Sequence, residues 1–188
     1  MATQLLKPGP YVIPMPVVLV GSVVDGKPNF MTAAFCGIAS VQPPVVALGL
    51  SPSHLTSRGI EERRQFSVNV PSEEQAVVTD WCGLVSGKDV DKSGVFETYT
   101  GALESAPLVA GVPLAFGCRL LHTLPLGVDT LYVAEVIDVH ADDAVLDRGE
   151  VDWAKVRPLL FTFPRPTYWR LGEHAGRAWS IGKGFREG

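Results

Sequence analysis

Glycine and proline divide this chain into short segments along its whole length, and this division limits the folds that it can adopt. The chain has 188 residues, of which 19 are glycine and 15 are proline. Runs rich in β-branched and other apolar residues lie between these interruptions, and such runs are typical of strands. The predicted strands are Val17–Val24, Asn29–Ile38, Val45–Leu50, Phe66–Val70, Leu114–Leu121, Thr130–Val139 and Arg157–Phe163.

Helices are few in the predicted pattern. They are expected over about Leu55–Arg64 and Glu73–Leu84, and Ser72 with Gln75 resembles a capping box for the second. A parallel α/β fold needs a helix between most strands, and the chain has no room for them. Many short strands with few helices therefore predict a mainly β fold, an antiparallel barrel with a few flanking helices. A hairpin turn at Asp25-Gly26-Lys27-Pro28 would join the first strands.

The composition indicates one globular domain over residues 1–188 and restricts its partners. Hydrophobic residues make up 46% and charged residues 19%, so part of an apolar surface could serve an oligomer interface. The net charge of −4 argues against a nucleic-acid partner. The apolar run over Val17–Val24 is too short for a bilayer, and no signal peptide is recognisable, so we expect a cytoplasmic protein without a membrane contact.

Several common chemical motifs are absent. Cys36, Cys82 and Cys118 are odd in number and form no CxxC pair, which argues against disulfides and against a zinc site. There is no dinucleotide-binding GxGxxG, P-loop or HExxH motif, so no metal is expected. A Ser-His-Asp arrangement stays open, although no GxSxG elbow supports it. Cys36 is interpreted as a buried, small hydrophobic residue rather than a reactive thiol.

Two stretches suggest a planar ligand that carries a phosphate. Asn29–Pro44 is a strand that ends in small and hydroxylated residues, where a flat ring could lie against the backbone. Ser51–Arg58 is a hydroxyl-rich turn at the start of a helix, and free N–H groups at a helix N-terminus suit an anion. The alternative is that Ser53 or Thr56 is only an N-cap. Lys88 and Lys92 follow in a polar loop, which on its residues alone is better interpreted as an exposed loop.

The order and spacing of these motifs resemble the flavin reductase-like, FMN-binding split-barrel family, especially its flavoredoxin branch. The resemblance begins at Asn29-x-Met31-Thr32-Ala33-x-Phe35-Cys36-Gly37 and extends over about Leu6 to Gly184. The further matching motifs are Ser40-x-x-Pro43-Pro44, Ser53-x-x-Thr56, Phe66-Ser67-Val68-Asn69-Val70-Pro71, Ser86-Gly87-x-Asp89-x-Asp91-Lys92, Ala106-Pro107-Leu108 and Gly127-x-Asp129-Thr130-x-x-x-x-Glu135-Val136.

The resemblance implies a six-stranded antiparallel split β-barrel with Greek-key topology. It also implies a homodimer with FMN in a groove at the dimer interface, and NADH or NADPH as reductant. No side chain need be catalytic, because the flavin N5 carries the chemistry. The implied cofactor-binding residues are Asn29, Thr32, Ala33, Ala34, Phe35, Cys36, Ser40, Ser51, Ser53, Thr56, Lys92, Asp129, Thr130 and Phe163. Phe163, Tyr168 and the tail from His174 to Lys183 are predicted to cover the nicotinamide side.

The chain departs from the family pattern at Asp129, where relatives commonly carry a histidine. A carboxylate directed at the flavin would disfavour its anionic reduced form and lower the redox potential. It would also repel the phosphates of a nicotinamide nucleotide. The sequence therefore argues more directly for FMN binding than for rapid oxidation of NADH or NADPH.

The first functional hypothesis is an oxidoreductase that passes hydride from NADH or NADPH through FMN. The acceptor would be a free flavin, an iron chelate or a protein such as a partner oxygenase. The alternatives are a non-catalytic, flavoredoxin-type electron carrier and a flavin-free split barrel that dimerises.

Overall fold

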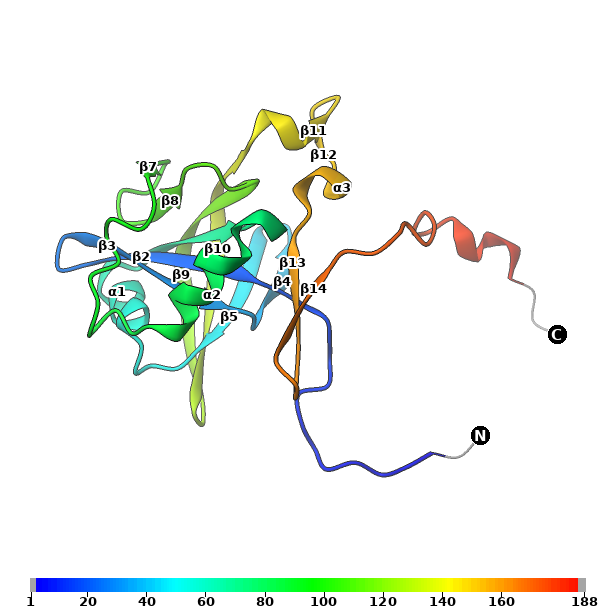
Figure 1. Ribbon diagram of the computed structural model, residues 1–188, viewed down its shortest axis with the longest axis horizontal. Helices are drawn as coiled ribbons and strands as arrows, with labels where there is room; N and C mark the ends of the chain where they lie inside the picture. The colour runs from blue at the N-terminus through cyan, green and yellow to red at the C-terminus, as the bar shows by residue number, and fades with distance from the viewer. Residues whose placement is uncertain (1–2, 186–188) are drawn as a thin grey trace.

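The main element of the fold is one seven-stranded antiparallel sheet, with strand order β3-β2-β6-β9-β10-β5-β4 (Figure 1). We describe a computed structural model, in which residues 3–185 are placed. The strands of this sheet are β2 (Val18–Val24), β3 (Lys27–Ala33), β4 (Cys36–Val41), β5 (Pro44–Leu50), β6 (Gln65–Val70), β9 (Leu114–Leu126) and β10 (Asp129–Ala141).

The sheet closes into a barrel through a bend in the chain at Ala34 and Phe35. β3 and β4 lie at opposite edges of the sheet, yet only these two residues separate them. The strand predicted over Asn29–Ile38 is therefore one passage of chain that bends from one edge to the other. With β3 and β4 counted as one bent strand, the seven strands become six, as predicted. β2 pairs with β6, and β5 with β10, which gives the Greek-key order and confirms the split-barrel fold.

The predicted hairpin between the first two strands is present, and a second hairpin, formed by β9 and β10, was not predicted. Asp25 and Gly26 have positive φ angles of 49° and 80° at the turn between β2 and β3, as that turn requires. β9 and β10 each run to 13 residues, longer than predicted, and join at Gly127 (φ 78°). The residues of β9 beyond Leu121 are exposed and include Pro125, so they lack the alternation by which a half-buried strand is recognised.

The barrel interior is filled by large side chains that are fully buried. Phe66, Leu48 and Tyr132 belong to the central cluster, and the Tyr132 hydroxyl donates to Glu61 Oε1 at 2.8 Å. A second cluster, which includes Phe30 and Cys82, lies between the barrel and its flanking segments. The flanking elements are thus fixed to the barrel by the same hydrophobic burial that closes it.

Both predicted helices are present. α1 (Leu55–Arg63) ends at Arg64, which has a left-handed φ of 59°. The second consists of a 3₁₀ turn, η1 (Glu73–Gln75), followed by α2 (Ala76–Leu84). The capping box at Ser72 is confirmed, and the Ser72 N–H donates to Gln75 Oε1 at 3.0 Å.

A second, three-stranded sheet of order β1-β13-β14 lies beside the barrel. Its strands are β1 (Met15–Pro16), β13 (Leu159–Thr162) and β14 (Thr167–Arg170). The strand predicted over Arg157–Phe163 therefore begins later than expected. Arg157 has a left-handed φ of 49° at the end of α3 (Trp153–Val156), and Pro158 makes an isolated bridge with Ser72. β14 was not predicted. Three of its four residues are exposed, so the strand lacks the alternation of buried and exposed side chains that sequence patterns detect.

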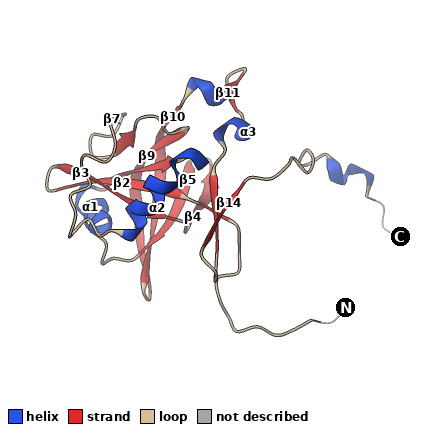
Figure 2. Cartoon of the chain, viewed as in Figure 1, coloured by secondary structure: helices blue, strands red, loops and turns tan. Residues whose placement is uncertain are grey.

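The remaining elements are short. They are β7 (Thr98–Thr100), β8 (Pro107–Val109), η2 (Asp143–Val145), β11 (Leu146–Asp147), β12 (Glu150–Val151) and η3 (Ile181–Gly184). The segments before β1 and after β14 extend away from the barrel, and η3 lies in the second of them (Figure 2). Within residues 3–185, no helix combines the length and the apolar character needed to cross a membrane.

Candidate functional site

Two adjoining hollows form one continuous groove along the end of β3. The first, which we call the apolar groove, has a volume of about 400 Å³. The second, the polar groove, has a volume of about 310 Å³. Met31, His54, Gly83 and Leu84 line both, so a ligand can extend from one into the other. The groove therefore offers one end for an apolar body and another for polar groups.

Most of the predicted site residues meet in this groove, although they come from distant parts of the chain. Those in the apolar groove are Thr32, Ala33, Ala34, Phe35, Ser51, Asp129 and Phe163. Those in the polar groove are Asn29, Ser53, Thr56 and Lys92. Cys36, Ser40 and Thr130 line neither hollow.

Three of the predicted residues lie outside the groove. Cys36 follows Phe35, packs against the central core cluster, and has its thiol pKa raised to about 11 by burial. Thr130 is buried within β10, and Ser40 lies further along β4 opposite Val45. Alternation of side chains across a strand explains why neighbours of groove residues need not line it.

The bend that closes the barrel also shapes the apolar groove. The Phe35 carbonyl accepts a hydrogen bond from the Gly49 N–H at 2.8 Å, which ties the bend to β5. Phe35 is 44% exposed as a residue, and its side chain is available as one face of the groove. Thr32 donates its hydroxyl proton to the Thr79 carbonyl of α2, so its side chain fastens the helix to β3. The backbone of Thr32–Phe35 is left beside the hollow.

The polar groove is built around a buried pair, Asn29 and Thr56. Asn29 Nδ2 donates to Thr56 Oγ1 at 2.7 Å, and both residues are buried. Because Thr56 Oγ1 accepts this bond, its own hydroxyl proton remains free for a ligand. Gly87 closes over the pair: a Cβ there would lie 2.3 Å from Asn29 Oδ1. Only glycine allows the loop this close to the asparagine.

Lys92 is buried at the same place, in contrast to the exposed loop that its sequence context suggests. Its Nζ donates to the Phe30 carbonyl at 3.1 Å and to the Cys82 carbonyl at 2.8 Å. Burial lowers its pKa from the ordinary lysine value. An ammonium group has three hydrogens, so one remains for an anion in the polar groove. Lys88 in the same groove is exposed, as predicted.

The turn before α1 supplies further donors. The N-cap of α1 is His54, whose side chain makes no capping hydrogen bond, so the alternative that Ser53 or Thr56 is the N-cap is wrong. Ser51 Oγ and Ser53 Oγ are 2.9 Å apart and bond to each other. Arg58 does not line the groove and instead pairs with Asp25 at 2.5 Å.

Sequence reasoning missed residues that the structure brings into the groove, chiefly His54 and Asp80. His54 lines both hollows; burial lowers its pKa, while the nearby Asp129 opposes that shift. Asp80 lies on α2 one turn before Gly83 and Leu84, and all three line the apolar groove. The helical spacing of these residues was a usable signal for a shared face. His54 offered none beyond its place in the turn.

With this geometry, comparison with known proteins identifies the class of the chain. Residues 11–169 match the family described as Flavin reductase like domain, so the chain belongs to that family. It is similar to a flavoredoxin from Methanosarcina acetivorans, at 38% identity over 97% of this chain and 98% of that one, with a TM-score of 0.94.

Two further similarities are more distant. An FMN-binding protein from Thermus thermophilus, solved with bound p-hydroxybenzaldehyde, is 27% identical over 94% of this chain and 98% of that one, with a TM-score of 0.77. A flavin reductase from Pseudomonas putida is 30% identical over 125 residues, which are 65% of this chain and 71% of that protein.

Proposed function

We propose that the groove holds FMN and that the protein is an oxidoreductase that moves electrons from NADH or NADPH to an acceptor. The observation that carries the proposal is the continuity of an apolar hollow with a polar one that contains a buried ammonium group. FMN has the same division into a flat ring and a phosphate. When bound, it would supply the hydride and electron transfer that the side chains of this chain do not provide.

The polar groove fits the phosphate end. Lys92 keeps one hydrogen, and Thr56 one hydroxyl proton, that no partner in the described residues uses. Ser53 and Lys88 line the same hollow. Charge-assisted hydrogen bonds to a phosphate are stronger than neutral ones, and a buried donor loses less of that strength to water.

The apolar groove fits the ring. Thr32–Phe35 present backbone beside the hollow, and Phe35 and Phe163 contribute aromatic faces. Asp129 also lines this hollow, so in the proposed complex its carboxylate lies on the ring side of the groove. There the carboxylate disfavours added negative charge on the ring. It also repels the phosphates of a nucleotide that approaches the ring.

We also propose a homodimer. Ile38 and Val41 on the edge strand β4 are 83% and 85% exposed, and Leu124, Leu126 and Val128 at the end of the β9–β10 hairpin are exposed too. A second copy of the chain would remove these apolar groups from water. Light scattering of the eluted peak in gel filtration should give twice the chain mass, and Ile38→Asp with Val41→Asp should return it to the chain mass. A monomer at all concentrations would refute this part.

The absorption spectrum of the purified protein tests the cofactor. A flavin spectrum, or its appearance on titration with FMN, is expected. Loss of flavin colour within seconds of anaerobic mixing with NADH or NADPH would support the oxidoreductase. A colourless protein that takes up no FMN would refute both the oxidoreductase and the electron-carrier hypotheses, and would favour the flavin-free dimer.

A second candidate is an FMN electron carrier that receives electrons from a protein. Asp129 in the apolar groove favours it, because a carboxylate there opposes the approach of a nucleotide phosphate. In this case FMN binds, but neither NADH nor NADPH reduces it on the seconds timescale. Restored reduction in Asp129→His would assign the difference to the carboxylate.

A further inference from the structure

One wall of the apolar groove comes from the hairpin β13–β14 rather than from the barrel. Phe161, Phe163, Pro166 and Tyr168 of this hairpin line the hollow. The facing walls come from the end of β3, the bend at Phe35, and α2. The position of the hairpin therefore determines the width of the groove.

The hairpin is attached to the barrel mainly at its base. Leu159 is buried, and its carbonyl accepts from the Val17 N–H at 3.0 Å. β1, the partner of β13, is only two residues long. From Phe163 onward the hairpin is exposed, except for Tyr168, which is half-buried. The part of the hairpin that lines the groove thus has few contacts to keep it in place.

Tyr168 makes the contact at the level of the groove. Its hydroxyl donates to Asp80 Oδ1 of α2 at 2.7 Å, and its ring lies against Phe161 with centroids 6.1 Å apart. Burial, and then Asp80, raise the pKa of Tyr168 to about 12, so the phenol keeps the proton that it donates at neutral pH.

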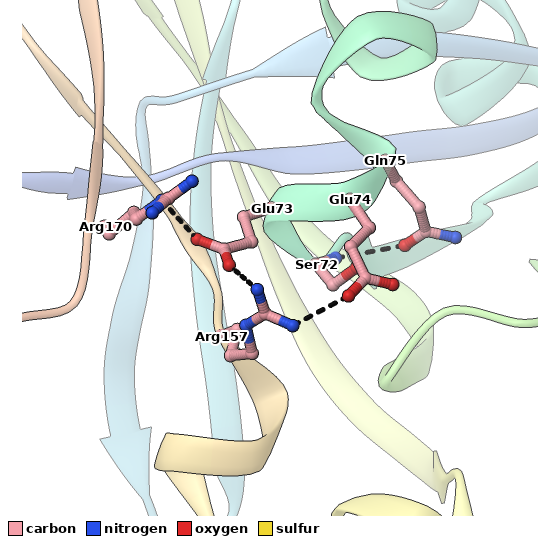
Figure 3. Close-up of polar contacts among 6 residues, drawn as sticks. All are labelled: Ser72, Glu73, Glu74, Gln75, Arg157 and Arg170. Carbon is pink, nitrogen blue, oxygen red and sulfur yellow. Dashed lines mark hydrogen bonds and ion pairs between the residues drawn. The ribbon is translucent and has the colours of Figure 1, made fainter.

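A second side-chain contact joins β14 to η1, the 3₁₀ turn before α2, and it lies farther along the strand. Arg170 Nε lies 2.5 Å from Glu73 Oε2, and Glu73 also pairs with Arg157 (Figure 3). Arg170 is 80% exposed in its side chain, and such a pair contributes little in water. Neither Arg170 nor Glu73 lines the apolar groove. Tyr168 is therefore the residue that fixes the wall beside the ligand.

We propose that the Tyr168–Asp80 hydrogen bond holds the β13–β14 hairpin as a fixed wall of the apolar groove, and that Tyr168 thereby determines which second ring reaches the cofactor. The apolar groove has a volume of about 400 Å³. With the wall fixed, that volume would have to hold the cofactor ring and a second ring together, so a single ring such as nicotinamide should enter more readily than the three fused rings of a free flavin. This inference rests on the proposed function for the identity of the rings. The fixed wall itself does not.

The wall is tested on the full chain without any cofactor. Hydrogen exchange of the amides of Phe161–Tyr168 should rise about tenfold in Tyr168→Phe, the factor for loss of about 1.4 kcal/mol, within the usual contribution of a hydrogen bond. Asp80→Ala should give the same increase in exchange rate. The variant that combines Tyr168→Phe with Asp80→Ala should exchange no faster than either single variant. Asp80→Asn keeps an acceptor and should stay near the original rate. Tyr99→Phe, outside both grooves, is the matched control.

The ring selection is tested on the FMN-loaded protein, photoreduced with EDTA as the sacrificial electron donor and then mixed with an acceptor under anaerobic conditions. Electrons pass as a hydride equivalent to riboflavin, which is reduced as the bound flavin is oxidised; ferricyanide instead takes single electrons without entering a stack. Tyr168→Phe should speed oxidation by riboflavin severalfold and change oxidation by ferricyanide less than twofold. The Asp80→Asn variant should resemble the unaltered protein with both acceptors.

The outcomes separate the two proposals. A protein that binds no FMN refutes the proposed function, while increased hairpin exchange in Tyr168→Phe would still support the fixed wall. Unchanged hairpin exchange in both Tyr168→Phe and Asp80→Ala refutes the wall. Suppose that Tyr168→Phe increases hydrogen exchange in the hairpin but leaves the ratio of the oxidation rates with riboflavin and ferricyanide unchanged. That result refutes the selection of rings by Tyr168.

Discussion

At the scale of single residues, Lys92 connects the structure of the barrel to its proposed ligand. Its ammonium group bonds the Phe30 carbonyl of β3 and the Cys82 carbonyl of α2, and it also lines the polar groove. A buried amine is costly unless its hydrogens find acceptors. Two carbonyls satisfy it in part, and a phosphate would satisfy the remainder. Lys92 thus stabilises the fold and prepares the site for an anion.

Replacing Lys92 by methionine should therefore affect both the stability of the fold and the binding of the anion. FMN affinity should fall about ten- to a hundredfold, since a charged hydrogen bond contributes about 1.5–3 kcal/mol. Thr56→Ala should weaken binding in the same direction. Fluorescence titration measures the affinity, and Lys88→Met, at an exposed lysine in the same groove, is the control with a smaller expected effect. Unchanged affinity in both Lys92→Met and Thr56→Ala would place the phosphate elsewhere.

Cys36 should react slowly with alkylating reagents despite its position next to the groove. Its pKa of about 11 lies above the ordinary value of 9.0 because burial disfavours the thiolate. The thiolate is the reactive form, so at pH 7.5 iodoacetamide should modify Cys36 about a hundredfold more slowly than a free cysteine. The rate should increase about tenfold per pH unit up to about pH 10. Rapid modification at neutral pH, followed by mass spectrometry, would contradict this assignment.

At the scale of elements, the polar groove depends on how closely one loop approaches one strand. A Cβ at Gly87 would lie 2.3 Å from Asn29 Oδ1, so Gly87→Ala must displace the loop or the asparagine. We expect FMN affinity to fall about tenfold, the loss of about one hydrogen bond. Gly94→Ala is the control, because a Cβ there meets nothing within 4 Å. Equal affinity in the two variants would mean that the Asn29–Thr56 pair does not bind the ligand.

The elements that could be predicted are those whose signals are local. β-Branched runs located the barrel strands, and Ser72 with Gln75 marked the start of the second helix, because alternation and capping depend on neighbouring residues. The bend at Phe35 had no such signal. It depends on the hydrogen bond from Gly49, which joins residues that meet only after the barrel closes.

The groove shows the same division between local and distant information. Asn29, Thr56 and Lys92 were placed through a resemblance of ordered motifs, and the structure brings them together. Asp80 and Tyr168 were not identified as partners because 88 positions separate them along the chain. A contact of this kind follows from the path of the C-terminal segment, which no local pattern specifies.

At the scale of the whole molecule, Glu73 joins the helix segment to the C-terminal part of the chain. Its side chain is only 10% exposed and pairs with Arg157 and Arg170 (Figure 3). Glu73→Gln removes the charge that both arginines contact; because water screens the two exposed guanidinium groups, the pairs together should contribute only about 1–2 kcal/mol to the free energy of unfolding, which the variant loses. Urea denaturation measures this loss. Glu74→Gln, at a 73% exposed partner of Arg157, should change stability by less than 1 kcal/mol, about the value of a surface pair.

Within residues 3–185, β3 and β4 are the two edge strands of the seven-stranded sheet. α2 packs on β3, whereas Ile38 and Val41 of β4 are open to water. An open edge offers unpaired backbone groups to any other extended chain, and its apolar side chains favour such pairing. In the proposed homodimer a second copy covers this edge, so the species most prone to aggregate would be the dissociated single chain. Because the concentration of the free chain then rises only as about the square root of the total, precipitation on mild warming should increase less steeply with protein concentration than it does for the Ile38→Asp, Val41→Asp variant.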